Sequence, residues 1–304
     1  MPAPIPKRTE PSPCGQAARD WFLHLLSLFC LLCTLASPGA AQNRPLRTAD
    51  SEILPPGTLR AEVGFDFLQG VDFPLTGLSG DLTSVGVIGL RLGVGKIVEV
   101  QLEGAARNFL DIKQRGASFV PLTLAGPNSA HDSGDFSLTT KVRILSETDR
   151  RPAVAMRFGF KIPNSKQSSG IGTNTTDIFA VVIQQKQFGK LNLFGNTGVA
   201  ILQAPKTAFK QNDVLVYGLA FAYPLHRRIH LVGEVAGRQS TRRITTDLVG
   251  TESQSQARFG FQVFAGGLQW DLAGIAGLAK TDPRSGFTFG VRKDFHLFHF
   301  DKAQ

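Results

Sequence analysis

Apolar and polar residues alternate one by one along most of this chain. Between Phe136 and Ile144 every second residue except Thr140 is apolar, and a matching run from Val154 to Ile162 follows a charged turn. The positions between the apolar residues hold small, hydroxyl-bearing or basic side chains, Lys161 among them. A period of two residues predicts β-strands, because successive side chains leave opposite faces of the pleat. Each run has about the ten residues that a tilted strand needs to cross a bilayer.

Twelve such two-faced segments follow one another. They are residues 59–67, 88–94, 98–107, 136–144, 154–162, 177–185, 191–201, 215–223, 229–238, 258–263, 268–272 and 287–295. Short connections alternate with longer polar ones, of which residues 110–134 are the longest. An even number of strands with short turns at one end and long loops at the other is typical of bacterial outer-membrane barrels. The pattern therefore predicts an all-β fold, a twelve-stranded antiparallel up-and-down transmembrane β-barrel over residues 58–300.

The first 41 residues differ from this pattern. Basic residues, the last of them Arg19, precede an apolar run from Trp21 to Leu35, and small residues follow up to Ala41. A basic region, a short apolar run and a small-residue cleavage site predict a signal peptide over residues 1–41 that is removed on export. Residues 42–57 are polar and contain several prolines. We expect them to form an extended periplasmic segment before the barrel.

Composition narrows the location and the partners. Cys14, Cys30 and Cys33 all lie in the leader, so the mature chain has no thiol for a disulfide or a metal site. The net charge of +9 could suit nucleic acid, but the basic residues occupy alternate strand positions and form no clustered patch. These features predict the outer membrane of a Gram-negative-type bacterium. The expected partners are outer-membrane lipids, the barrel-assembly machinery and a small-molecule solute, with no nucleic acid and no cofactor.

The last segment carries a family resemblance. It contains Phe287, Phe289, Gly290 and Phe295, and it is similar to the aromatic-ended final strand by which outer-membrane proteins are recognised for assembly, although the chain continues past it. With its strand pattern and this glycine–aromatic hairpin, the mature chain resembles the twelve-stranded barrels grouped with phenol-degradation-pathway (MetA-pathway) outer-membrane transporters. The resemblance implies a barrel with a transport role.

Strand parity assigns side chains to the barrel interior. The predicted polar wall comprises Glu99, Glu103, Arg107, Lys141, Arg143, Arg157 and Lys161. The predicted apolar wall comprises Ile178, Ala180, Val182, Phe194 and Val216. Such a lumen suits an amphipathic or aromatic solute better than a sugar, and its charges would set selectivity. Two alternatives remain open: the charges pair across strands and fill the interior, or the 110–134 loop folds in and plugs it.

Catalytic and metal chemistry have weak sequence support. His131 lies near Ser129 and Asp132, but in a polar loop where chance proximity is common, and His226 and His230 flank an expected periplasmic turn. His296, His299 and Asp301 form a weak metal-like group in the tail, where solvated side chains are the simpler interpretation. We expect no catalytic residue and no metal ligand in this chain.

The sequence thus predicts a channel that passively admits small solutes, hydrophobic or aromatic ones among them. A closed structural or surface-interaction barrel without transport is the first alternative, and a barrel lipid hydrolase is the second. Single-channel conductance would separate the channel from the closed barrel. A fluorogenic phospholipid would reveal the hydrolase.

Overall fold

The computed structural model describes residues 44–298, which form thirteen β-strands and one 3₁₀ turn. The elements are β1 (Thr58–Phe73), β2 (Leu78–Gly93), β3 (Val98–Arg115), β4 (Ser129–Asp132), β5 (Phe136–Leu145), β6 (Ala153–Ile162), η1 (Gln167–Ser169), β7 (Ile178–Phe188), β8 (Leu191–Gln203), β9 (Gln211–His226), β10 (Ile229–Ser240), β11 (Gln254–Ala265), β12 (Leu268–Gly277) and β13 (Ser285–His296). Within residues 44–298, no helix is long and apolar enough to cross a membrane.

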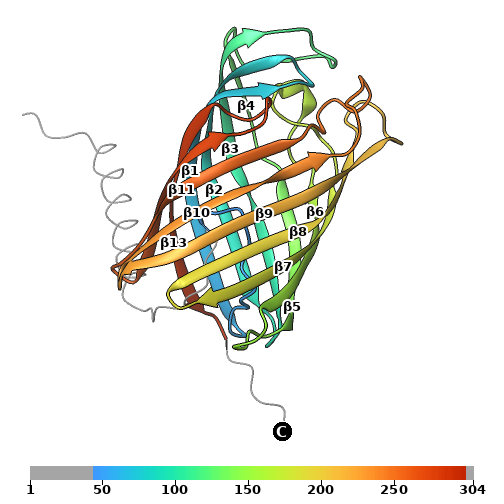
Figure 1. The fold of residues 1–304 in the computed structure, drawn as a ribbon. Helices are drawn as coiled ribbons and strands as arrows, with labels where there is room; N and C mark the ends of the chain where they lie inside the picture. The colour runs from blue at the N-terminus through green and yellow to red at the C-terminus, as the bar shows by residue number, and fades with distance from the viewer. Residues whose placement is uncertain (1–43, 299–304) are drawn as a thin grey trace, which may run out of the picture.

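The sheet closes on itself. β1 pairs antiparallel with β2 on one side and with β13 on the other, and the remaining strands pair with their neighbours along the chain. The short strand β4 pairs with residues 108–111 of β3, while an earlier part of β3 pairs with β5 and continues the barrel. Figure 1 shows the tilted strands, with the short turns gathered at one end and the longer connections at the other. The predicted twelve-stranded antiparallel barrel is confirmed.

The outer face of the barrel is apolar. Leu219 is 68% exposed and Phe259 is 56% exposed, although both lie in the middle of strands. Aromatic rings also pair side by side on this face, Trp270 with Phe289 and Phe65 with Phe287. Water-soluble proteins rarely expose apolar surface on this scale, whereas a lipid-facing barrel requires it.

Two expected loops are partly strand. The alternation pattern predicts a connection between the segments 59–67 and 88–94, but β1 runs to Phe73 and β2 begins at Leu78, which leaves a four-residue turn. Register shifts in this hairpin lie next to Gly70 and Gly86, both with positive φ. Such bulges reverse which parity faces inward, so the simple alternation is lost there although the strands continue. Likewise, β3 extends to Arg115 and β4 lies inside the expected 110–134 loop.

Residues 44–57 lie inside the barrel, and the expectation of an extended periplasmic segment is wrong for them. Ala49 and Asp50 are 0% and 2% exposed, and Leu54 is 3% exposed. Figure 1 draws this stretch in blue within the ring of strands. We call residues 44–57 the lumen segment. Its contacts, described below, define the site.

Candidate functional site

The lumen segment is held by carboxylates of the barrel wall. The Arg44 guanidinium forms ion pairs with Asp66 of β1 at 3.3 Å and with Asp271 of β12 at 3.5 Å. On β10, the Glu234 carboxylate accepts hydrogen bonds of 2.8–2.9 Å from the backbone N–H groups of the residues at positions 47 and 48. Charge-assisted bonds of this kind are stronger than neutral ones. The segment is therefore anchored at both its start and its middle.

The second half of the segment crosses to the opposite wall. Asp50 pairs with Lys141 of β5 at 3.1 Å, and Lys141 also lies 3.1 Å from Glu99 of β3. The Ser51 backbone N–H donates to the side chain of Gln185 on β7 at 3.0 Å, and the Leu54 N–H donates to Glu99 at 2.9 Å. Between residues 44 and 54 the segment thus touches strands from most of the circumference, and it occupies much of the bore.

Glycines on the inner face make room for the segment. A Cβ placed on Gly218 of β9 would lie 2.7 Å from the Thr48 hydroxyl oxygen, and one on Gly93 of β2 would lie 2.3 Å from the Pro55 carbonyl oxygen. Distances this short are not tolerated, so any larger residue would move the segment. The glycine positions are therefore part of how the wall accepts this stretch of chain.

The titration of the segment reflects its burial and its partners. Although burial acts against ionisation, the nearby cations, Lys141 first, lower the pKa of Asp50 below its ordinary value of 3.8. Burial, reinforced by the negative charge of Asp50, raises the pKa of Glu52 from 4.5 to about 7. Two acidic side chains two residues apart thus take opposite shifts, because only one of them faces the lysine directly.

Most of the predicted polar wall faces the interior, largely in pairs. Glu103 lies between two guanidinium groups, at 3.3 Å from Arg91 and 3.8 Å from Arg157. Lys161 pairs with Asp177 at 2.8 Å and with Asp135 at 3.5 Å. Lys141 and Glu99 hold the lumen segment, as described above. Arg143 lies near the short-turn end of β5 and donates to the Lys96 carbonyl oxygen at 3.0 Å.

The predicted inward position of Arg107 is wrong. Its side chain is exposed and bonds to the His131 ring at 2.8 Å, beside the exposed Phe109. The parity of β3 changes here, because Leu110 and Ile112 are the buried positions beyond it. Counting every second residue from Glu99 and Glu103 places residue 107 on the inner face. This counting fails where the alternation of a strand is interrupted, as it is here.

An apolar wall lies on the predicted strands, but some of its residues differ from the predicted ones. Ile178, Ala180 and Val182 pair across β6 with Phe160, Phe158 and Met156, all exposed on the outer face, so their predicted inward orientation is wrong. The inward residues of β7 are Phe179, Val181 and Ile183. The cause is that β7 is apolar on both faces from 178 to 183. Alternation cannot choose between the faces of such a strand, whereas its pairing with β6 does.

The remaining two members of the predicted apolar wall do face inward. Phe194 of β8 is buried and packs with Leu46 of the lumen segment, and Val216 of β9 packs beside Val181, Ala200 and Leu202. Part of the predicted wall thus contacts the lumen segment. The other part borders open space.

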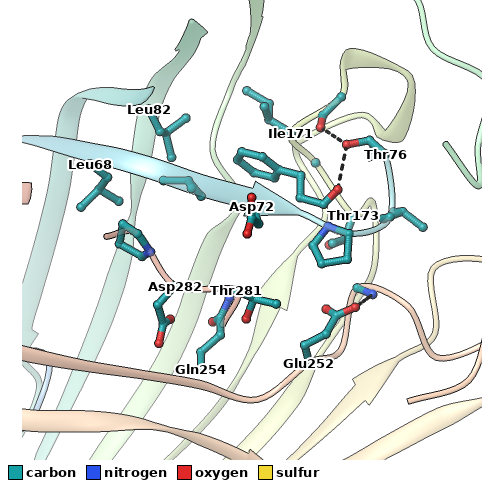
Figure 2. A pocket seen from close by; sticks show the side chains of 18 of the residues that line it. Leu68, Asp72, Thr76, Leu82, Ile171, Thr173, Glu252, Gln254, Thr281 and Asp282 are labelled. Carbon is teal, nitrogen blue, oxygen red and sulfur yellow. Dashed lines mark hydrogen bonds between the residues drawn. The ribbon is translucent and has the colours of Figure 1, made fainter. Parts of the chain in front are cut away.

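Among the described residues, three of the cavities that border the segment have volumes of about 270, 330 and 390 Å³. Arg47 lines all three, so they adjoin at its side chain. Figure 2 shows the first, at the long-loop end, where Asp72 and Thr76 lie across from Glu252 and Asp282. We call the second, bordered by β3 and by β5–β11, the middle cavity. The third lies between the segment and β1–β3.

Sequence reasoning missed the residues of the lumen segment altogether. The pattern of residues 42–57 places Arg44, Arg47, Asp50 and Glu52 in a polar stretch outside the barrel. One signal in the sequence could have pointed to them. Several charged residues lie close together before the first strand, and charges of both signs also lie at the wall positions predicted to face inward. The sequence does not show which charge of the segment pairs with which charge of the wall, because these pairs form only in the folded chain.

Within residues 44–298, no group of three or more His, Cys, Asp or Glu side chains is arranged to hold a metal ion. His131 bonds to Arg107, while Asp132 accepts hydrogen bonds from Ser169 and Lys166, so the residues around His131 are engaged in loop structure. His299 and Asp301 lie outside the described residues.

The 110–134 loop packs Leu122 and Leu124 against the outer ends of β2 and β3, and it lines none of the three cavities described above.

A closed barrel with an apolar exterior and a charged, partly filled lumen defines the class: this is an outer-membrane-type β-barrel. The chain belongs to the family described as "Putative MetA-pathway of phenol degradation", whose model matches residues 42–292, which confirms the resemblance noted in the sequence. A search of curated protein sequences finds no match.

The chain is also similar to solved structures of outer-membrane channels. An outer membrane channel from Pseudomonas putida F1 superposes with a TM-score of 0.59 at 14% identity, over 86% of this chain and 100% of that chain. The outer membrane channel DcaP of Acinetobacter baumannii is more distant, with a TM-score of 0.42 at 12% identity, over 81% of this chain and 100% of that chain. At such identities the first likeness shows the fold.

Proposed function

We propose that this protein is an outer-membrane channel that passively admits small amphipathic solutes, aromatic ones among them. The observation that carries the proposal is the middle cavity, whose lining combines the apolar side chains of Phe179, Val181 and Val216 with basic side chains. A solute with an apolar body and a polar group matches both sides of this cavity, whereas a sugar would leave the apolar side poorly satisfied.

The location follows from the same features. The apolar outer face requires lipid, and the family and the Pseudomonas putida channel support an outer-membrane setting. We infer that residues 1–41 direct export, that the barrel-assembly machinery inserts the barrel, and that the short turns face the periplasm. The cavity of Figure 2 then opens toward the outside.

The test is transport by the purified barrel in planar bilayers and proteoliposomes. We expect a small conductance for the intact mature chain and a several-fold larger one for a variant lacking residues 44–54, because these residues fill much of the bore. Uptake of a small aromatic solute should exceed that of a sugar of similar size. Equal uptake of the two solutes, or no difference between the intact and shortened chains, would contradict the proposal.

A second candidate is a closed barrel without transport. The observation that favours it is the number of buried bonds that hold the lumen segment, including Asp50–Lys141 and the Glu234 anchor. If the intact chain neither conducts nor takes up solute while the shortened chain does both, the closed barrel is the better description. The lumen segment would then be what closes the bore.

A further inference from the structure

We propose that the middle cavity is a binding site for an organic anion with a flat apolar body, an aromatic carboxylate being the simplest example. This inference rests on the proposed function, since it requires that small solutes reach the lumen. The cavity volume of about 330 Å³ is within the range of small-molecule sites. Its lining carries both a surplus of basic side chains and an apolar surface.

The basic side chains of the cavity exceed its acidic ones. Arg47, Arg157, Lys161 and Arg238 line it, against Glu103 and Asp177 as the acidic residues. Asp177 forms an ion pair with Lys161, and Glu103 forms ion pairs with both Arg157 and Arg91. Both carboxylates therefore already have cationic partners. The lining thus has two more basic than acidic side chains, while Glu252 and Asp282 act on Arg238 from the neighbouring cavity.

Two guanidinium groups are left over. Within the described residues, neither Arg47 nor Arg238 forms an ion pair. The Arg238 Nε donates to the Glu252 carbonyl oxygen at 2.9 Å, which fixes the direction of its side chain. The Arg47 backbone is fixed by Glu234, while its side chain is exposed to all three cavities. A guanidinium group keeps its charge at any ordinary pH and presents several donors, which suits a carboxylate.

A third guanidinium group joins the charged side to the apolar side. The Arg157 Cζ lies 5.8 Å from the centroid of the Phe179 ring, and its buried Nε has no hydrogen-bond partner among the described residues. Val181, Leu202 and Val216 continue the apolar surface from Phe179. A flat ring could therefore stack beside Phe179 while its carboxylate meets arginine donors. An inorganic anion would use only the charged half of this arrangement.

Equilibrium binding to the folded barrel in detergent tests the site without requiring transport. We would titrate benzoate, its neutral analogue benzyl alcohol and inorganic phosphate by calorimetry at neutral pH. Benzoate should bind at least about tenfold more tightly than either comparison ligand. Arg47→Gln and Arg238→Gln should each weaken benzoate binding about tenfold, because each removes a charge-assisted bond, and should leave benzyl alcohol unaffected. Phe179→Ala should weaken both aromatic ligands.

The matched control is Arg242→Gln, an arginine-to-glutamine change at an exposed position paired with Asp213 and outside the cavity. It should leave benzoate binding unchanged. Arg47 lies outside the strands, so its variant should keep the folded barrel, which the mobility difference between boiled and unboiled samples verifies. Unchanged benzoate binding in both cavity variants overturns the site, and so does equal binding of benzoate and phosphate.

The outcomes also separate this site from the proposed channel. Benzoate binding in detergent that depends on Arg47 and Arg238, with no uptake in proteoliposomes, supports the site and contradicts the channel. Benzoate uptake that is the same in wild type and in both variants, together with unchanged binding, supports the channel and overturns the site.

Discussion

The Asp50 carboxylate and the Lys141 ammonium form an ion pair of 3.1 Å inside the barrel, with side chains that are 2% and 1% exposed. One partner belongs to the lumen segment and the other to the wall strand β5. Lys141 also meets Glu99, so a single buried cation joins the segment to two wall strands. Much of the inward charge thus holds a piece of the chain in the bore and does not line an open path.

Replacing Asp50 by Asn should loosen the lumen segment. The change leaves Lys141 buried with Glu99 alone, and we expect a loss of about 2 kcal/mol, less than for a fully orphaned charge because Glu99 remains. Unfolding by guanidinium in lipid vesicles measures the loss, and conductance should rise. Asp149→Asn, in an exposed short-turn position, is the control and should change neither quantity. Identical conductance of Asp50→Asn and wild type would contradict this assignment.

The pH dependence of conductance should report on Glu52. Its pKa in the seated segment, about 7, lies above the ordinary value of 4.5, so the seated segment holds the proton more tightly than a released one. Seating is therefore strongest below pH 4.5, weakens as pH rises to about 7, and changes little above that value. The lowered pKa of Asp50 acts only at more acidic pH and in the opposite direction, since its contribution is lost as pH falls.

Conductance should accordingly be higher at pH 8 than at pH 5. Glu52→Gln should remove that difference and hold the low-conductance state at both values, because the neutral amide mimics the protonated acid. The variant isolates the effect of the Glu52 carboxyl group from that of any other titrating side chain. A pH response that is the same in Glu52→Gln would assign the effect to other groups.

Adding a side chain at Gly218 should displace the segment. A Cβ there would meet the Thr48 hydroxyl oxygen at 2.7 Å, so Gly218→Val should cost about 1–3 kcal/mol of stability or push Thr48 away from Glu234. Gly195→Val on the neighbouring strand is the matched control, since nothing lies within 4 Å of its Cβ position. Larger conductance in the first variant alone is the expected result. Equal conductance in the two would show that the wall yields more easily than the segment.

Labelling can test the orientation of β7 directly. All three cysteines lie at or before residue 33, so a chain beginning at residue 42 contains none and single substitutions are unambiguous. A fluorophore attached at Ile178→Cys should be quenched by brominated lipid, because this position is on the outer face. The same fluorophore at Phe179→Cys should resist that quencher and respond to a water-soluble one. The reverse result would restore the orientation predicted from the sequence.

The sequence by itself determined the class of fold. A bilayer requires outward side chains to be apolar and every backbone donor to be paired, so the alternation in segments such as 136–144 and 154–162 carries the architecture. Counting alternate residues along each segment was enough to locate strand starts such as Thr58. The same counting identified inward positions such as Lys141 and Arg157. Counting works wherever a strand is regular and one of its faces is polar.

Only the tertiary structure decided what fills the lumen. The Asp50–Lys141 pair joins residues 91 positions apart, and no local pattern encodes which charge of the wall meets which charge of the segment. Register decided the faces of β7, because Ile178 and Phe179 are equally apolar. A change of parity within β3, between Glu103 and Leu110, decided the position of Arg107. Periodicity is a property of neighbouring residues, whereas occupancy of the bore depends on contacts that exist only after the barrel has closed.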